Sequence, residues 1–466
     1  MTVTHPARGM RDFLPDDVRR RAYVVSVIAG VYERYGFEPL ETPAVENIET
    51  LLGKYGDEGD RLIFKILKRG EGAERGEADL ALRYDLTVPL ARVVAEYRGM
   101  LPRFFKRYQI QPVWRADRPQ RGRYREFYQC DVDAIGSRSP VVEAELCAAA
   151  AEALTRLGFA TFTVRLNHRQ LLAGLLEASG VPGDLQGAAL VALDKLDKIG
   201  RDAVSGELDD RGVPPAAAAS LLDLFDRLGP AAGTSAVAVG TDEALRTLSD
   251  RVAGLPEARA GLENLAEIVA LCAGTPAAGR IRIDPSLARG LAYYTGAIME
   301  IAVTDLAGSL GGGGRYDRLV GMFLGDDVPA AGFSLGLERI LVVMTERGMF
   351  PPHLTGAAAD VMVTLWNTSG RAAALALAGE LRAAGLRVDV YPDADRLGKQ
   401  FKYAAARGVP LVAVLGDDEV ARGEVAIKDL RSGEQHAVPR ATLAAALRDR
   451  LAVPPAAGAS GAAPHA

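Results

Sequence analysis

Two neighbouring segments of the chain alternate polar and apolar residues with the two-residue period of a β-strand. Residues 107–115 and 124–134 show this pattern, and the loop between them contains Pro and Gly, which interrupt regular structure. We therefore expect an antiparallel hairpin. Alternation places five side chains on one face of its second strand, namely Arg125, Phe127, Gln129, Asp131 and Asp133. That face is either the floor of a polar ligand site or a solvated outer face with salt bridges.

Helical spacing occurs on both sides of this hairpin. Asp16 or Asp17 can cap a first helix and Gly36 can end it. The stretch from 168 to 278 is rich in Ala and Leu, and we expect a helical insertion there, between two parts of a mixed sheet. The other expected elements are a helix at 17–35, a strand at 37–40, a helix at 143–157 and a strand at 162–166.

A new pattern begins after residue 350. Residues 349–358 predict a linker, and strands and helices then alternate as βαβαβ, which implies a parallel sheet. The tail from Val453 lacks core-forming residues and is expected to be disordered. The expected elements are strands at 361–365, 387–391 and 410–415, helices at 371–384 and 398–407, and a hairpin from 424–430 and 435–438.

Composition is that of a folded soluble protein, with 466 residues, 48% hydrophobic and 25% charged. No apolar run approaches the roughly 20 residues that a membrane helix needs, and no secretory signal is evident, so we expect a cytoplasmic protein. Three cysteines without a CxxC pair predict neither a disulfide framework nor a metal site. The net charge is −5, yet eight Lys and Arg residues fall between Arg103 and Arg125, which indicates a local anion site.

Three further clusters could bind a ligand. If the backbone is extended, Asp85 and Thr87 lie on the same side and could hold an ammonium group, although Asp and Thr near a Pro more often cap a helix or stabilise a turn. The stretches RGLAYYTG at 289–296 and GGGGRYD at 311–317 suit close approach of backbone to a ligand, or a flexible loop tip. Adjacent tyrosines in a strand would point to opposite sides. Arg339, in the first turn of an expected helix, suits a ligand contact better than helix stabilisation.

Taken in order, these segments resemble the histidyl-tRNA synthetase family, which belongs to the class II aminoacyl-tRNA synthetases. The segments YGFEPLETP at 35–43, Arg115 to Gly136 and GFSLGLERI at 332–340 resemble class II motifs 1, 2 and 3. LRYDLTVPLAR at 82–92 resembles the family's amino-acid-binding turn, and RGLAYYTG and GGGGRYD its two histidine motifs. LNHR near 167, ALDKLDKIG from 192 and LGKQFKYAAARGVPLVAVLG from 397 complete the set.

The resemblance implies an α/β fold. An α+β catalytic domain would hold an antiparallel sheet flanked by helices, followed by an α/β anticodon-binding domain. The implied divisions are a first catalytic part at 1–167, the insertion at 168–278, a second catalytic part at 279–348, a linker at 349–358, an anticodon-binding domain at 359–452 and a tail at 453–466.

The resemblance also assigns roles to residues. Arg289 and Arg115 would be catalytic at the α-phosphate. Gln120 would contact the tRNA acceptor end. Two positions depart from the family, because Asp117 stands where Glu is common and Ala292 where Asp is common. Histidine would be bound by Asp85, Thr87, Gln129, Asp133, Tyr293 and Tyr294, and ATP by Arg115, Asp117, Arg123, Phe127 and Arg339.

The implied activity is that of a histidine–tRNA ligase. ATP would activate L-histidine to histidyl-adenylate, which is then transferred to the 3′ end of tRNA(His), with Mg²⁺ bound chiefly through ATP. The resemblance also implies a homodimer without membrane contact. The alternative is a histidine-sensing regulatory paralogue of the same fold, whose relatives typically lack the anticodon domain.

Overall fold

The computed structural model describes residues 4–229, 240–288, 293–304, 306, 308–355 and 357–452. The chain forms two compact units, Met1–Phe350 and Pro351–Ala466. None of the helices in these described ranges is long and apolar enough to cross a membrane.

The N-terminal unit is built on an eight-stranded sheet with the order β1-β5-β6-β11-β10-β9-β7-β8. Only the outer pairs β1–β5 and β7–β8 are parallel, and the other pairs are antiparallel. The predicted hairpin is confirmed as β5 and β6. The strands are β1 Glu38–Pro39, β5 Phe105–Trp114, β6 Glu126–Ile135, β7 Thr163–His168, β8 Ile281–Ile283, β9 Ala297–Ala302, β10 Ser309–Arg315 and β11 Ala330–Gly336.

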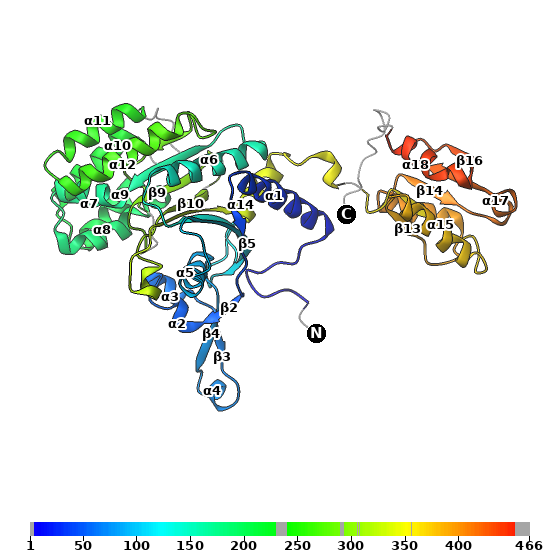
Figure 1. The fold of residues 1–466 in the computed structure, drawn as a ribbon, viewed down its shortest axis with the longest axis horizontal. Helices are drawn as coiled ribbons and strands as arrows, with labels where there is room; N and C mark the ends of the chain where they lie inside the picture. Colours follow the sequence, from blue (N-terminus) through cyan, green and yellow to red (C-terminus); the bar gives the residue numbers. More distant parts are fainter. Residues whose placement is uncertain are drawn as a thin grey trace. The chain divides into compact units, whose positions relative to one another are not determined.

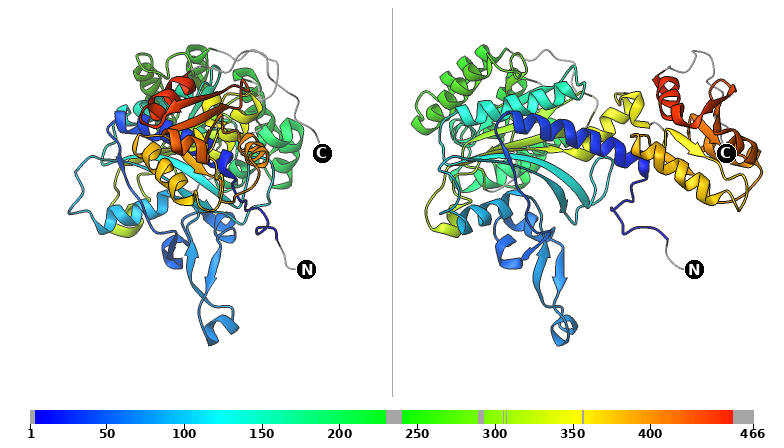
Figure 2. Two further views of the ribbon diagram at one scale, coloured as in Figure 1. Left: turned by 90° about the vertical axis from the view of Figure 1, so that its right-hand side faces the viewer. Right: turned by 45° about the vertical axis from the view of Figure 1, so that its right-hand side comes forward.

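The helices on the apolar face of this sheet include α1 Pro15–Arg34, α6 Val141–Arg156 and α14 Leu337–Glu346. Figure 2 shows α1, the long blue helix, lying against the sheet. The predicted aspartate cap of α1 is wrong, because Leu14 is the N-cap and makes no side-chain hydrogen bond. Asp16 and Asp17 instead lie in the first turn, where negative charge favours the helix dipole. Gly36 follows the helix with φ of +74°, as expected for its end.

The smaller elements of the N-terminal unit pack around a second core cluster, which includes Tyr55, Tyr84, Tyr293 and Tyr316. In Figure 1 the segment bearing β3 and β4 projects from the body of this unit. These elements are β2 Val45–Asn47, β3 Lys65–Leu67, β4 Ala78–Leu82, α2 Ile48–Leu51, α3 Gly56–Arg61, α4 Glu71–Glu74, α5 Thr87–Glu96 and α13 Gly321–Leu324.

Helices fill the chain between β7 and β8, where a helical insertion was expected. Its buried apolar residues belong to the same core cluster as the sheet and its covering helices, so the insertion packs as part of the N-terminal unit. Its helices are α7 Arg169–Ala178, α8 Gln186–Leu193, α9 Leu196–Asp210, α10 Pro215–Leu228, α11 Thr241–Arg251 and α12 Pro256–Cys272.

The C-terminal unit has a five-stranded sheet with the order β13-β12-β14-β15-β16. β12 pairs in parallel with β13 and β14, and β15 and β16 form a hairpin, so the predicted βαβαβ pattern and hairpin are confirmed. The expected disordered tail lies outside the described residues. The elements are β12 Val361–Val363, α15 Arg371–Ala383, β13 Val388–Val390, α16 Leu397–Ala406, β14 Leu411–Val414, α17 Asp417–Arg422, β15 Glu424–Asp429, β16 Gln435–Pro439 and α18 Leu443–Ala452.

Close strand packing requires glycine at position 332. A Cβ added to Gly332 would lie 1.8 Å from Oδ1 of Asp133. We expect Gly332→Ala to lower the free energy of unfolding by roughly 1–3 kcal/mol through overpacking, as measured by denaturant titration. Gly206→Ala in α9 is the matched control, because its added Cβ meets no heavy atom within 4 Å and Ala favours a helix. Equal stability losses in the two variants would contradict the packing argument.

Candidate functional site

A buried polar surface crosses the face of the large sheet opposite α1 and α6. Strand register pairs Gln109 with Asp131 and Asp131 with Ser334. Register pairs Arg107 with Asp133 in the same way. The two aspartates are each only 2% exposed, so the alternative of a solvated outer face is wrong. Burying these polar groups is costly unless they are paired with one another or with a ligand.

Glycines continue this surface onto the next strand. Gly312 pairs with Ser334 and Gly314 with Gly332, and all lie within regular strands rather than at a loop tip. A Cβ on Gly314 would meet the ring of Tyr294 at 3.0 Å. The run of four glycines therefore lets side chains lie directly on the sheet backbone.

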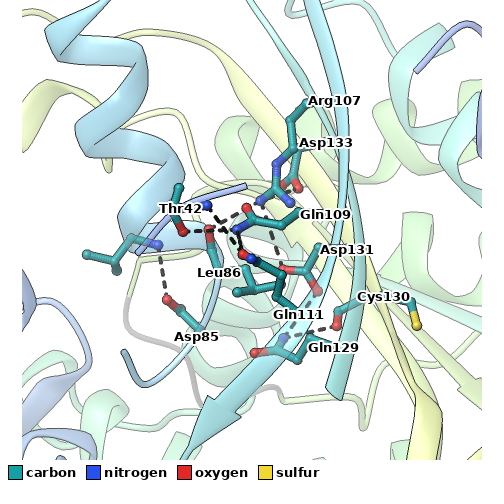
Figure 3. A network of polar contacts seen from close by, with 12 residues as sticks. Thr42, Asp85, Leu86, Arg107, Gln109, Gln111, Gln129, Cys130, Asp131 and Asp133 are labelled. Carbon is teal, nitrogen blue, oxygen red and sulfur yellow. Dashed lines mark hydrogen bonds and ion pairs between the residues drawn. The ribbon is translucent and has the colours of Figure 1, made fainter. Parts of the chain in front are cut away.

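Arg107 is the cation of the polar surface. Its Nη2 lies 2.9 Å from Oδ2 of Asp133 and 4.0 Å from Oδ2 of Asp131 (Figure 3). The Tyr316 hydroxyl donates to Asp133. Burial raises the pKa of Asp131 to about 7, although Arg107 opposes that shift. Burial also raises the pKa of Asp133. One guanidinium thus faces two carboxyl groups that are difficult to ionise together.

Two carboxamide oxygens on this surface have no hydrogen-bond partner within the described part of the chain. They are Oε1 of Gln109 and Oε1 of Gln129, both buried. The amide nitrogen of Gln129 donates to Ser334 Oγ at 3.0 Å, which fixes the orientation of this side chain. Since an unpaired buried acceptor costs about 1–3 kcal/mol, these oxygens indicate a polar ligand or bound water.

Thr42 and two glutamines extend the network along β5. Nε2 of Gln109 donates to Thr42 Oγ1 at 2.9 Å and to Gln111 Oε1 at 2.6 Å (Figure 3). Buried Arg83 donates to the carbonyl of Thr42 at 2.6 Å and to Gln111 at 2.9 Å. The segment before β2 is therefore tied to the strand that carries the polar side chains.

The segment around Asp85 differs from the expected extended backbone. Thr87 begins α5, and Oδ1 of Asp85 accepts the backbone N–H of Val88 at 3.0 Å, so the capping alternative is correct. Asp85 also accepts hydrogen bonds from Tyr55 at 3.0 Å and from Tyr293 at 3.2 Å. Burial raises its pKa. The start of α5 and Tyr293 of the RGLAYYTG stretch thus both contact the buried carboxyl group of Asp85.

The side chains of Tyr293 and Tyr294 do not point to opposite sides, as a strand would require. Their rings pack edge to face with centroids 5.1 Å apart, because residues 293 and 294 precede β9 rather than lie within it. The Tyr293 ring also lies 6.0 Å from the Tyr316 ring. Tyrosines therefore connect the Asp85 end of the polar region to the Asp133 end.

Arg115 follows β5 and lies between two aromatic rings. Its guanidinium carbon is 4.4 Å from the Tyr84 ring and 5.1 Å from the Phe127 ring, and its Nε donates to the Tyr84 carbonyl at 3.0 Å. Cation–π contact and this hydrogen bond together hold the planar cation in one orientation. Arg115 and Phe127 are thus adjacent, next to the Asp85 segment.

The loop between β5 and β6 is held by its own ion pair. Nη2 of Arg123 lies 2.9 Å from Oδ2 of Asp117, while Gln120 is exposed near the loop tip. Nη1 of Arg339 donates to the Ser309 carbonyl at 2.6 Å, and its Nε donates to Gly122 at 3.4 Å. Arg339 therefore bridges the loop and β10.

Some residues of the network had no individual role predicted from the sequence. They are Arg107, Asp131 and Tyr316, although Asp131 lies on the polar face predicted for the second hairpin strand. Tyr55 carried no local signal, because only tertiary packing brings it to Asp85. Arg289 lies outside the described residues.

The sequence matches known protein families over most of its length. Residues 9–340 match the family described as histidyl-tRNA synthetase, and residues 360–450 match an anticodon binding domain. The histidine–tRNA ligase of Gloeobacter violaceus is 42% identical over 472 residues, covering 95% of this chain and 98% of that protein. That of Porphyromonas gingivalis is 41% identical over 460 residues, covering 94% and 98%. The crystal structure of histidyl-tRNA synthetase from Nostoc sp. PCC 7120 gives a TM-score of 0.77 at 30% identity, covering 97% and 100%.

An antiparallel sheet with a buried polar face, in one chain with an anticodon-binding unit, defines a class II aminoacyl-tRNA synthetase. The chain belongs to the histidyl-tRNA synthetase family, and its function is that of a histidine–tRNA ligase.

Burial of Asp131 makes stability depend on pH. Its pKa in the folded chain is raised from 3.8 to about 7, so its stabilising contribution is full below 3.8 and is lost as pH rises through about 7. Asp131→Asn removes this dependence. We expect the Tm of the variant minus that of the parent protein to be greater at pH 8 than at pH 5, as measured by circular dichroism. The exposed Asp250→Asn change is the control, and equal differences at both pH values would refute the expectation.

Proposed function

We propose that the buried polar region binds L-histidine between its two ends. Asp85 and Thr87 hold the α-ammonium group at one end, and Gln129 and Asp133 bind the imidazole nitrogens at the other. Tyr293 and Tyr294 form the walls of the pocket. The main support is the continuous line of contacts from Asp85 through Tyr293 and Tyr316 to Asp133.

Hydrogen bonding explains how such a pocket selects histidine. Oε1 of Gln129 is buried without a partner in the described chain, and Asp133 has one oxygen in contact with Arg107. An imidazole offers one donor and one acceptor, or two donors when protonated. An apolar side chain of similar size leaves the Gln129 oxygen unpaired, and a site built around such a hydrogen bond can reject the wrong ligand by roughly 10⁴-fold or more.

ATP occupies the side of the region near the β5–β6 loop in this proposal. Arg115 contacts the α-phosphate, and Phe127 stacks on adenine. Asp117, Arg123 and Arg339 contribute further nucleotide contacts. The aromatic stacking of Arg115 supports its role, because a cation fixed before the reaction loses little entropy when the substrate binds.

The reaction proceeds in two displacements. The histidine carboxylate attacks the α-phosphorus and pyrophosphate leaves, and then a ribose hydroxyl of tRNA attacks the activated carbonyl and AMP leaves. Two anions must approach each other in the first step, so Arg115 and Arg289 act by offsetting negative charge at phosphorus. The protein supplies position and charge rather than a nucleophile.

The proposed partners are tRNA(His) and a second copy of the chain, in the cytoplasm. Mg²⁺ would be held mainly by ATP oxygens, because this ion keeps several of its waters and usually binds through substrate phosphates rather than in an all-protein cage. Identity to histidine–tRNA ligases and the anticodon-binding match favour charging of tRNA over a purely regulatory role.

Histidine-dependent exchange between ATP and pyrophosphate tests the activation site. We expect exchange by the parent protein and a loss of roughly 10²-fold or more in Arg115→Ala and in Arg289→Ala, because each removes charge that stabilises the transition state. Arg98→Ala, an exposed change just after α5 and outside the cationic segment, is the control and retains exchange. Near-normal exchange by Arg289→Ala with only weaker tRNA binding would show that its proposed role is wrong.

The rate of tRNA charging tests the proposed role of Gln120 separately from amino-acid activation. The Gln120 side chain is exposed in the β5–β6 loop, so Gln120→Ala should leave pyrophosphate exchange unchanged while slowing the charging of tRNA(His). Exchange by the same variant is the internal control. Unchanged charging would remove the proposed acceptor contact.

A further inference from the structure

A buried arginine at the outer part of the large sheet contacts three carboxylates. Arg165, on β7, has a side chain that is 7% exposed. Its Nε lies 2.7 Å from Asp284 Oδ2, and its Nη1 lies 2.6 Å from Asp197 Oδ2 and 3.0 Å from Glu300 Oε1. We call these four residues the Arg165 cluster.

The Arg165 cluster joins parts of the chain that are distant in sequence. Asp197 belongs to α9 of the helical insertion, Asp284 directly follows β8, and Glu300 lies on β9. Burial opposes the charge of Arg165, but the three carboxylates together raise its pKa, so the guanidinium stays charged. Leaving a buried charge unpaired is strongly unfavourable, so Arg165 holds the three elements that carry its carboxylate partners in one arrangement.

The same cluster lies in line with the proposed histidine site. Register pairs Arg165 with Glu300, and Glu300 with Gly312. Gly312 pairs with Ser334, and Ser334 pairs with Asp131. Residues paired directly across strands share one face of a sheet. The Arg165 cluster is therefore the continuation of the polar surface beyond the glycine strand.

The cluster also holds the segment that leads to Arg289 in sequence. Oδ1 of Asp284 accepts from the backbone N–H of Ser286 at 3.0 Å and from its hydroxyl at 2.5 Å. Beside it, Nδ2 of Asn167 donates to the carbonyls of Pro285 at 3.2 Å and Leu287 at 2.9 Å. Residues 284–287 are thus fixed to β7 by side-chain contacts.

We propose that Asp197 of the helical insertion is a positioning residue for histidine activation, acting through Arg165 on Asp284 and Glu300. This inference rests on the proposed roles of the polar face and of Arg289. Asp197 does not touch a substrate. It holds Arg165 from the insertion side, so that Arg165 aligns the 284–287 segment and the β9 edge of the site floor.

A positioning role differs from a purely structural one in its kinetic signature. Asp197→Asn leaves Arg165 with two carboxylates, so the fold should persist, but the guanidinium can shift toward Asp284 and Glu300. Displacement of charge that acts on the transition state lowers kcat more than it raises KM. We expect kcat for histidine-dependent pyrophosphate exchange to fall roughly tenfold, with much smaller changes in KM for histidine.

Matched variants separate this effect from general damage to the insertion. Asp223→Asn removes an exposed ion pair between α10 and Arg201 of α9, and it should leave both constants unchanged. Asp197→Glu restores the carboxylate and should recover most of kcat. Ser286→Ala removes one hydrogen bond to Asp284 at a partly buried position, and it should lower kcat as Asp197→Asn does. This variant replaces Asp197→Asn in the experiment if Asp197→Asn does not fold.

The outcomes are distinct. Absence of exchange in the parent protein would defeat the proposed function itself. An active parent protein with normal kcat in Asp197→Asn, or in Ser286→Ala where the first variant does not fold, would overturn the positioning role alone. A rise in KM without a fall in kcat would also overturn it, as would failure of Asp197→Glu to restore kcat.

Discussion

The catalytic unit depends on burying two carboxyl groups, Asp131 and Asp133, on one face of its large sheet. Both are 2% exposed, and Arg107 at 0% exposure is the cation nearest to them. Charged groups in such a position need fixed partners, which β5, β6 and Tyr316 provide. The opposite face can then be apolar and is covered by α1, α6 and α14. The division of the sheet into a polar and an apolar face thus creates both the core and the site.

The division of the large sheet into a polar and an apolar face also explains where its glycines lie. Gly312, Gly314 and Gly332 occupy polar-face positions beside Ser334 and Asp133, where a Cβ on Gly332 or Gly314 would collide with neighbouring atoms. Their cost in chain entropy is offset by room for side chains and substrate on the sheet. A row of polar residues on this face consequently extends from Gln109 on β5 to Arg165 on β7.

Much of the fold follows from local pattern. Alternation predicted β5 and β6, helical spacing predicted α1 and α6, and the βαβαβ order predicted the C-terminal sheet, because each signal depends on residues close in sequence. The N-cap of α1, the helical start at Thr87 and the packed rings of Tyr293 and Tyr294 differed from expectation. Only the Asp85–Thr87 segment was open between two conformations, and there the contacts of Asp85 with Tyr55 and Tyr293 accompany the helical start.

The amino-acid sequence by itself determined which residues could bind anions, ammonium or imidazole, since their chemistry and strand alternation are local properties. Tertiary structure alone decided which of them meet. Asp85 contacts Tyr293 from a position 208 residues away, and Arg165 collects carboxylates from α9, β9 and the end of β8. Such contacts depend on strand order and on desolvation of the assembled face, and neither property is encoded in a short window of sequence.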